Sequence, residues 1–369
     1  MHLNDLRTEA ERVLTICNIC NYCNGFCDVF NVSEQRRDFS SGDLGHLAHL
    51  CHNCRDCLDA CQYAAPHPFD IHVPRTMAAL RQDSYDICAP WPRYFSKAGW
   101  RGLILPLGLM VLMPLLSMLL LPEGRMSNSG ASFYGVIDWG SLTLLASLSL
   151  GWGAAGVLLA TVRYWSLCRG AIMAQRGVWS ALPAMISDAL TLRNLGGSIE
   201  PGQSPGCNDV DDRLSGARRR LHHCVFYGFC LCFASTSVAT CYHHFLGIQA
   251  PYDWRSLPVL FGASGGGLML IGCLGLMSLK LRSNPAFHLS GVRNGEYALL
   301  ISLFLVAGSG MALLIFRASN AMPSLLMMHV GAVVGFFVML PYGKMLHGPF
   351  RVIALLLAAM ERSDRKQVR

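Results

Sequence analysis

The stretch CNICNYCNGFC at residues 17–27 decides the N-terminal part of the fold, because it spaces four cysteines by two, two and three residues. The stretch CHNCRDCLDAC at 51–61 repeats that spacing. This is the pattern with which bacterial ferredoxins hold [4Fe–4S] clusters, since three thiolates at this spacing can reach three irons of one cubane. We therefore predict that the two motifs bind iron–sulfur clusters.

The two motifs are expected to interlock, because in two-cluster ferredoxins the fourth cysteine of each motif binds the other cluster. This rule assigns the first cluster to Cys17, Cys20, Cys23 and Cys61. It assigns the second cluster to Cys51, Cys54, Cys57 and Cys27. A structural zinc site uses two separated cysteine pairs, so the spacing disfavours zinc. Residues 1–95 are thus predicted to form a domain with two [4Fe–4S] clusters.

Several features of this domain depart from simple ferredoxins. Asp28 and Gln62 stand where proline usually follows the fourth cysteine. Ser41 or Asp43 can cap a helix ahead of the second motif, and little of the region alternates like a strand. We expect an α-helical ferredoxin domain that docks beside a flavoprotein. Its histidines are interpreted as surface groups or neighbours of the sulfurs, not as ligands: His46, His49, His52, His67 and His72.

The rest of the chain is predicted to be a membrane bundle of cytochrome b type, which makes the whole protein all-α. Hydrophobic residues make up 52% of the chain, charged residues only 14%, and the mean hydropathy is +0.36. A soluble domain carries about 25% charged residues. Within residues 96–350, six apolar segments approach the ~20 residues that a bilayer demands of a helix. They run near 102–121, 139–163, 221–246, 258–280, 296–316 and 324–346.

Charge distribution predicts the orientation of this bundle. The formal net charge is +7, which in a membrane protein reflects loop position and does not indicate nucleic-acid binding. Basic residues gather before the first segment, between the second and third, between the fourth and fifth, and after the sixth. The other three loops carry one arginine each. This bias, with no apolar signal segment at the start, places both termini, the 1–95 domain and a charged tail at 351–369 in the cytoplasm.

Histidines in the apolar segments are candidate haem ligands. The third segment carries His222, His223, His243 and His244, and the sixth carries His329 and His347. The last two are 18 residues apart, so on one helix they would share a face about 27 Å apart. In antiparallel helices His222 or His223 meets the level of His347, and His243 or His244 meets the level of His329. Paired imidazoles would hold one or two b-type haems; alternatively, histidines at segment ends lie in the polar interface.

The paired motifs, the stretch YAAPHPFDIHVP after Cys61 and the six-segment half together resemble the tricarballylate utilisation protein B (TcuB, or CitB) family over nearly the whole chain. The resemblance implies a bacterial inner-membrane protein that reoxidises the flavin of a partner, an FAD-dependent tricarballylate dehydrogenase. Electrons would pass through iron–sulfur clusters and haem to the quinone pool. A related module is fused to a flavoprotein in cobalamin biosynthesis, so the partner's substrate stays open.

Two other readings stay open at this stage. The chain could serve another respiratory complex, such as a heterodisulfide-reductase-like assembly, or its clusters could be regulatory, as in an iron-responsive sensor. No GxGxxG motif follows a strand, and no nucleophile constellation is present. We therefore predict neither a flavin or nicotinamide site nor an independent substrate site, and treat the chain as a redox subunit.

Overall fold

The computed structural model describes residues 3–89, 99–120, 133–172, 177–196, 207, 210, 215–283 and 290–365. Its elements in chain order are α1 (Leu3–Cys20), α2 (Asp28–Ser33), α3 (Ser41–Leu50), α4 (Asp56–Asp59), α5 (Val73–Cys88), η1 (Gly99–Leu103), α6 (Ile104–Leu120), α8 (Phe133–Val136), α9 (Trp139–Arg169), α10 (Val178–Leu190), η2 (Arg193–Gly196), α11 (Ala217–Leu246), α12 (Leu257–Arg282), α13 (Ser290–Phe316), α14 (Met322–Met339), η4 (Leu340–Tyr342), η5 (Lys344–Leu346) and α15 (His347–Arg365).

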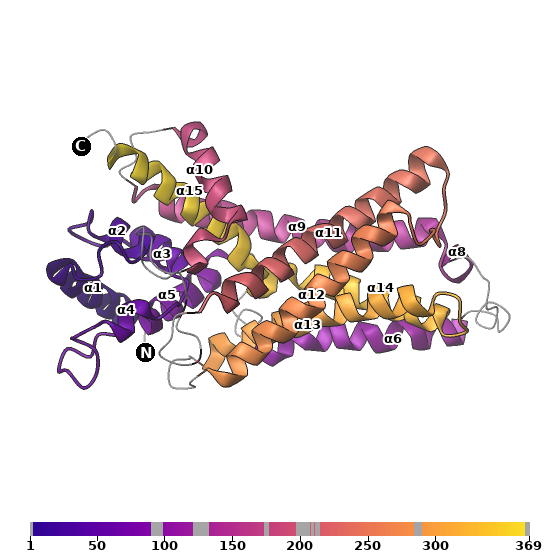
Figure 1. Ribbon diagram of the computed structural model, residues 1–369, viewed down its shortest axis with the longest axis horizontal. Helices are drawn as coiled ribbons and strands as arrows, with labels where there is room; N and C mark the ends of the chain where they lie inside the picture. The colour runs from indigo at the N-terminus through magenta and orange to yellow at the C-terminus, as the bar shows by residue number, and fades with distance from the viewer. Residues whose placement is uncertain are drawn as a thin grey trace.

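The predicted all-α fold is confirmed. Within the described ranges, β pairing is limited to an isolated bridge between Cys207 and Ser215. Helices α1 to α5 gather at one end of an elongated molecule, and α6, α9 and α11 to α14 extend away from them (Figure 1). Each long helix has one end on the side of the N-terminal domain (Figure 1). The polar, cysteine-rich part and the apolar part of the sequence therefore occupy opposite ends of the molecule.

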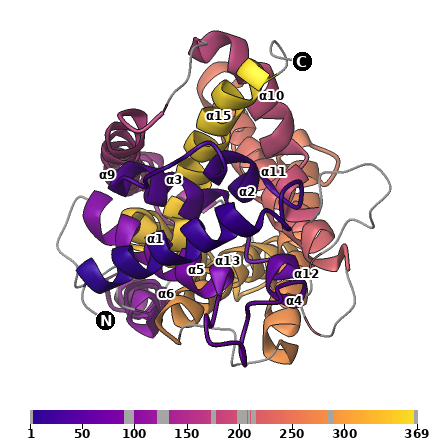
Figure 2. The ribbon, with the colours of Figure 1, turned by 90° about the vertical axis from the view of Figure 1, so that its left-hand side faces the viewer.

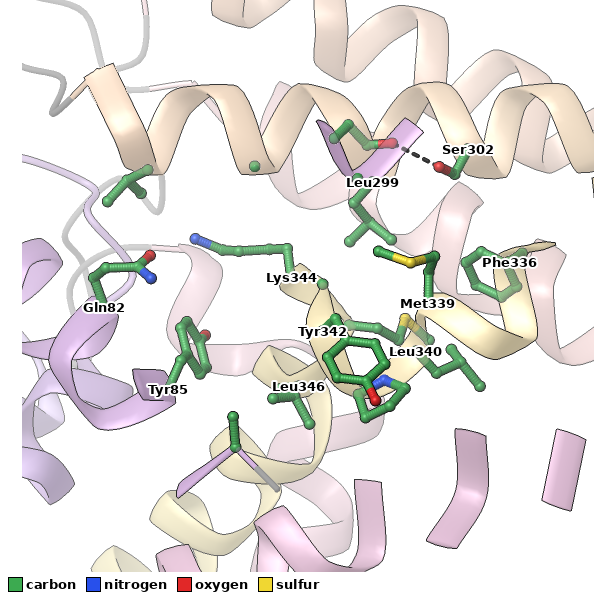
Figure 3. Close-up of a pocket in the computed structure, with 18 residues that line it drawn as sticks. Gln82, Tyr85, Leu299, Ser302, Phe336, Met339, Leu340, Tyr342, Lys344 and Leu346 are labelled. Carbon is green, nitrogen blue, oxygen red and sulfur yellow. Dashed lines mark hydrogen bonds between the residues drawn. The ribbon is translucent and has the colours of Figure 1, made fainter. Parts of the chain in front are cut away.

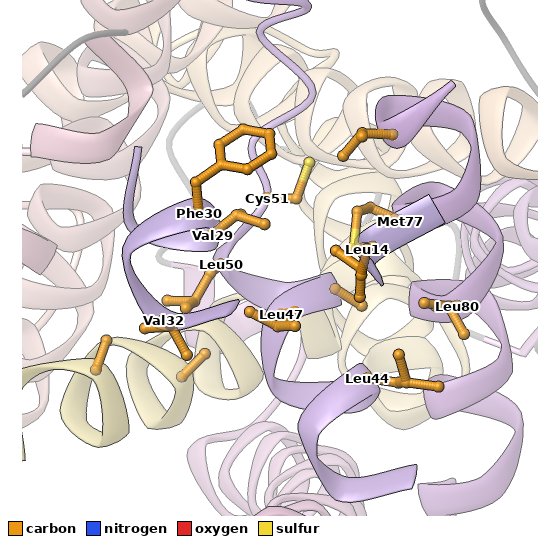
Figure 4. Packing of buried hydrophobic residues seen from close by; sticks show 14 of the residues in the cluster. Leu14, Val29, Phe30, Val32, Leu44, Leu47, Leu50, Cys51, Met77 and Leu80 are labelled. Atoms are coloured by element: carbon orange, nitrogen blue, oxygen red, sulfur yellow. The ribbon is translucent and has the colours of Figure 1, made fainter. Parts of the chain in front are cut away.

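The core of the N-terminal domain forms around α3, which presents Leu44 and Leu47 to side chains of α1 and α5 such as Leu14 and Met77 (Figure 4). Burying each such leucine contributes about 1.5–3 kcal/mol. The cap of α3 is Ser40, not Ser41 or Asp43 as expected from the sequence. The Ser40 hydroxyl accepts from the Asp43 backbone N–H, and the Asp43 carboxylate accepts from the Ser40 backbone N–H. This capping box fixes where α3 starts, ten residues ahead of the second cysteine motif.

The predicted charged tail at 351–369 is wrong for residues 351–365; 366–369 lie outside the described residues. Helix α15 lies against α3 and α10 at the N-terminal end of the molecule (Figure 2). It buries Ala354, Leu355 and Ala358 in the same core as the N-terminal domain. The prediction failed because the last nine residues are mostly charged or polar. Residues 361–365 continue an amphipathic helix whose apolar face lies just before them in the sequence.

Among the described residues, five helices are long and apolar enough to cross a membrane: Trp139–Arg169, Ala217–Leu246, Leu257–Arg282, Val292–Phe316 and Met322–Tyr342. The predicted first segment forms α6, which has 17 residues and contains Pro114. It is shorter than the ~20 residues of a full span. The structure therefore supports five of the six predicted segments by length, and α6 as a shorter apolar helix packed on α14.

The sixth segment does not continue as one helix to His347. Helix α14 ends at Met339, two 3₁₀ turns follow, and His347 begins α15. Pro341 cannot donate a backbone hydrogen bond, and Gly343 weakens helical propensity, so the helix stops here. The prediction that His329 and His347 share one face of a single helix is therefore wrong. His347 belongs to the helix that packs on the N-terminal domain.

Glycines bring α11 and α12 into close contact. A Cβ added at Gly228 would lie 2.8 Å from the Gly265 carbonyl oxygen, and one at Gly272 would lie 2.8 Å from the Leu221 carbonyl oxygen. Only glycine permits backbones to approach this closely. The sequence FGASGGGLMLIG in α12 thus serves helix packing, and it fixes the rotation of α11, which carries four of the candidate histidines.

Candidate redox centres

The first predicted set of cysteines lines one cavity. Cys17, Cys20 and Cys23 reach it from the end of α1 and the turn after it, and Cys61 reaches it from the end of the second motif. The cavity encloses about 220 Å³, and Ile16, Tyr63 and other apolar side chains complete its wall. Cys61 thus joins the first motif across 38 residues of chain. This is the crossover that the ferredoxin rule predicts for a fourth ligand.

The second predicted set lies beside the first. The thiol of Cys27 is within electrostatic range of Cys51 and Cys54, and Cys57 is within range of all three. Cys57 also borders the first cavity. The two sets are therefore adjacent, and the described chain brings together the two groups of four that the spacing assigned.

Without a bound cation, the thiols of both sets stay protonated. Burial raises the pKa of Cys17 to about 12, and the neighbouring thiols of Cys23, Cys61 and Cys20 add to the rise. Burial likewise raises the pKa of Cys57 well above its usual value. Metal ions reverse such shifts, because they bind the thiolate and release its proton.

The arrangement suits a polynuclear cluster. Among the residues that the structure describes, no three His, Cys, Asp or Glu side chains converge closely enough to hold a single metal ion. The first set surrounds a volume instead, as four thiolates must when four irons and four sulfides separate them. The first set therefore leaves room for a cluster between its thiols.

Three arginines hold the loop of the second motif, and one of them, Arg81, is buried. The Arg81 and Arg351 guanidinium groups each donate to the Cys51 carbonyl, both at 2.7 Å. The Arg218 guanidinium donates to the Asn53 carbonyl at 3.1 Å. Arg81 belongs to α5, but Arg218 begins α11 and Arg351 lies in α15. The cluster loop is thus fastened directly to the two helices that carry His222 and His347.

Three of the histidines near the motifs are core residues, and for them the surface interpretation is wrong. His46 and His49 are each 1% exposed and His52 is 8% exposed. The His46 ring bonds the Ala354 carbonyl at 3.0 Å, and the His49 ring bonds the Ser84 hydroxyl at 2.7 Å. These hydrogen bonds join α3 to α15 and α5, so the histidines build the scaffold that supports Cys51.

The structure brings His222 and His347 together. Their ring centres are 6.2 Å apart, with the ring planes at 77°. Two imidazoles that bind one metal from opposite sides hold their centres roughly 6 Å apart, because each metal–nitrogen bond is about 2 Å long. The His347 Nδ1–H donates to the Lys344 carbonyl at 2.6 Å, which directs Nε2 away as a ligand. The pair therefore fits an axially bound haem.

The remaining candidate histidines are not paired in this way. His329 bonds the Ser309 hydroxyl at 3.0 Å through Nδ1. His243 stacks on Trp139 with ring centres 3.7 Å apart, and His223 lies against Tyr227. His244 is exposed. Among the described residues, no ring contact joins His329 to His243 or His244, in contrast to the His222–His347 pair.

The sequence predictions missed a charged group beside His347. The Glu296 carboxylate of α13 accepts from the Lys344 ammonium at 2.9 Å and also pairs with Lys280 of α12. A signal was present: Glu296 is the one acidic residue in its apolar segment, and such a residue needs a partner.

Comparisons with known proteins agree with this architecture. Residues 10–86, which contain all eight motif cysteines, match the family model of the citrate utilization protein B Fer4-like domain. Residues 98–368 match the model of citrate utilization protein B. The chain is 37% identical to citrate utilization protein B of Escherichia coli over 373 residues, covering 99% of this chain and 95% of that protein. No solved structure matches.

A Fer4-like domain with eight cysteines at ferredoxin spacing is an iron–sulfur domain. It is joined here to helices that are compatible with a membrane protein by length and composition. Both matched regions together leave little of the chain uncovered. The protein belongs to the citrate utilization protein B family, as an electron-transfer subunit of citrate or tricarballylate utilisation.

Proposed function

We propose that this protein reoxidises the reduced flavin of an FAD-dependent dehydrogenase that acts on a tricarboxylate such as tricarballylate. The electrons pass through two [4Fe–4S] clusters and one haem b to a quinone in the bacterial cytoplasmic membrane. One observation carries the proposal. His222 and His347 face each other at haem-ligand spacing, and their own helices hold the loop of the second cysteine motif through Arg218 and Arg351.

The spacing of residues along α11 and α15 supports direct electron transfer from the second cluster to the haem. Arg218 and His222 are one helical turn apart on α11, as are His347 and Arg351 on α15. Four residues of helix rise about 6 Å. When bound, the clusters and the haem supply the one-electron chemistry. The two arginines fix the Cys51–Asn53 loop one turn from the histidine pair, so the protein supplies a short and rigid separation.

The first motif offers the entrance for electrons. Ile19 is 78% exposed and Tyr22 is 64% exposed, and both adjoin Cys20 and Cys23. Large apolar side chains at the surface beside a redox site favour contact with a protein partner. We assign this face to the flavoprotein, which places its flavin nearer the first cluster than the second.

The orientation in the membrane follows from the same arrangement. The end of α9, the start of α11, the end of α12 and the start of α13 lie at the end that carries the N-terminal domain, and the sequence places basic residues at these helix ends (Figure 1). Basic loops stay on the cytoplasmic side. We therefore assign the cluster domain, α15 and both termini to the cytoplasm, where a soluble dehydrogenase can reach them.

A combined optical and EPR reduction titration of the detergent-purified protein tests the proposal. We expect one haem α-band per chain and two interacting cubane signals, all reducible by the flavoprotein with its substrate present. A cluster content without haem bands would instead support a regulatory iron–sulfur protein. Reduction by a thiol–disulfide enzyme, and not by a flavoprotein, would support the heterodisulfide-reductase-like reading.

The crossover of ligands has its own test in paired alanine variants. Cys20→Ala with Cys61→Ala removes two ligands of one cluster, so about half of the iron should remain. Cys20→Ala with Cys27→Ala removes one ligand from each cluster, so nearly all of the iron should be lost. Iron and sulfide analysis measures the difference, and Cys88→Ala, a buried cysteine outside both motifs, serves as the control. The reverse order of iron contents would show that each motif serves one cluster alone.

A further inference from the structure

A second cavity lies where the cluster domain meets the ends of the long helices. Gln82 and Tyr85 of α5 form one wall, α13 contributes Gly295 and Ser302, and the turn after α14 contributes Tyr342 and Lys344 (Figure 3). Most other side chains around it are apolar and come from α13, α14 and the turn. Apolar cavities with a few convergent polar groups bind small molecules, and typical sites measure about 300–1,000 Å³. This one encloses about 70 Å³, so it can take in one polar edge of a ring and not a whole drug-sized molecule.

Tyr85 gives this cavity an available hydrogen-bond donor. Its side chain is 5% exposed, it lines the cavity, and its buried hydroxyl has no hydrogen-bond partner among the described residues. Leaving a buried hydroxyl unpaired costs about 1–3 kcal/mol. The ring is fixed between His49 and Phe350, with centres 5.2 and 5.5 Å away. A ligand with a carbonyl oxygen in the cavity would satisfy this donor.

The cavity also adjoins the histidine pair. Lys344 lines it, and the Lys344 carbonyl accepts the hydrogen bond from His347 Nδ1. The Lys344 ammonium lies toward Gln82 in Figure 3 and pairs with Glu296. A ligand in this cavity would therefore contact a residue that is hydrogen-bonded to the proposed haem ligand three positions later, with a cation nearby.

Open space extends from the backbone of α13 into this region. Gly295 lines the cavity, and a Cβ added there would meet no atom within 4 Å. The Ser302 hydroxyl further along α13 bonds the Ala298 carbonyl of its own helix at 2.9 Å, so it does not close the cavity. The wall on this side belongs to a helix that is apolar enough to cross a membrane.

We propose that this cavity binds the headgroup of a 1,4-quinone, with one carbonyl oxygen accepting a hydrogen bond from the Tyr85 hydroxyl and the isoprenoid tail leaving along α13 and α14. The inference rests on the proposed function, which requires a quinone but does not say where it binds. The apolar wall suits the ring and tail, and the polar wall faces the cluster domain.

The chemistry at this site balances as a two-electron reduction. The quinone takes two electrons, delivered one at a time from the reduced flavin through the iron–sulfur domain and His347. It takes two protons from cytoplasmic water, and its two carbonyls become hydroxyls as two O–H bonds form. Tyr85 orients the first carbonyl, and the Lys344 ammonium, which the Glu296 carboxylate holds in place, stands on the side of the developing oxygen charge.

Photo-crosslinking of the full-length protein with an azido-ubiquinone analogue tests the location without any mutation. The label should map to peptides containing Gln82–Tyr85, 292–302 or 339–346, and excess decylubiquinone should suppress it. Labelling that decylubiquinone suppresses but that maps only elsewhere, such as near His329 or Trp139, would overturn the assignment.

Gly295→Leu supplies the functional test, because its side chain would fill the cavity without a backbone clash. Its matched control is Gly267→Leu in α12, where an added Cβ also meets no atom within 4 Å and which is not among the residues that line this cavity. After dithionite reduction, decylubiquinone should reoxidise the haem at least roughly tenfold more slowly in Gly295→Leu than in Gly267→Leu. Equal rates with an unchanged haem spectrum contradict the proposed cavity.

The same measurement separates this inference from the proposed function. If decylubiquinone does not reoxidise the reduced wild-type haem, the quinone step of the proposed function fails, and the cavity assignment fails with it. If it reoxidises wild type and Gly295→Leu alike, only the cavity assignment fails. Tyr85→Phe should weaken quinone competition for the label several-fold, whereas Tyr164→Phe, which loses a hydroxyl bonded to the Gly45 carbonyl, should not.

Discussion

His347→Ala is expected to abolish the haem absorption bands of the purified protein while most of the iron–sulfur content remains. His347 supplies one of two imidazoles whose centres are 6.2 Å apart, and the Lys344 carbonyl orients its ring. Loss of this imidazole would leave His222 as the single histidine of the pair that could hold a haem. The cysteines stand on other helices, so the clusters do not depend on this imidazole. Pyridine haemochrome and iron analyses measure the two contents separately.

Two further histidine variants make this prediction specific. His222→Ala removes the facing ligand and should cause the same loss. His223→Ala is the matched control, because its ring turns toward Tyr227 on another side of α11, and it should keep its haem. Retained haem in both His347→Ala and His222→Ala, with loss in His329→Ala, would move the site to the far end of the bundle. Full retention in all four variants would exclude histidine ligation by these residues.

The sequence was sufficient to predict the parts of the site that depend on local spacing. The motif at 17–27 and its repeat at 51–61 predicted both the helical cluster domain and the grouping of Cys61 with the first motif, which the cavity at Cys17 matches. Ligand spacing of this kind is a covalent constraint, so tertiary context cannot alter it. Chain direction also predicted that His347 would lie level with the start of the third segment, where His222 is found. The assumption behind this prediction, one continuous helix from His329 to His347, was wrong because α14 ends at Met339.

The sequence was insufficient where distant segments share a surface. Helix α15 ends in a run of charged residues, yet Glu361 is buried against Arg36, 325 residues away in the sequence. The fastening of the cluster loop by Arg218 and Arg351 depends on how α11 and α15 approach α3, which no local pattern encodes. The Tyr85 cavity likewise forms only where α5, α13 and the turn after α14 meet. Such features require the rotation and approach of whole helices, and these arise from packing.

Glu361→Ala should destabilise the cluster domain severely, although Glu361 lies at the start of the charged terminal stretch. The Arg36 guanidinium lies between the Asp43 and Glu361 carboxylates, and the three side chains are 3%, 7% and 2% exposed. Removing one partner of a buried ion pair costs about 3–5 kcal/mol, because the remaining charge loses its compensation without regaining water. Asp43 also closes the capping box of α3, so a displaced Arg36 disturbs the helix that leads to Cys51.

The matched control for this prediction is Glu9→Ala, whose carboxylate also pairs with an arginine. The Glu9 and Arg12 side chains are 37% and 41% exposed, and such a surface pair contributes only about 0–1 kcal/mol. Thermal unfolding followed by circular dichroism and cluster absorbance should show a drop of roughly 10 °C for Glu361→Ala and little for Glu9→Ala. Glu361→Gln, which keeps the length and an acceptor oxygen, should lie between them. Equal stability of Glu361→Ala and Glu9→Ala would mean that water reaches Arg36, and that α15 is not bound tightly to the cluster domain in solution.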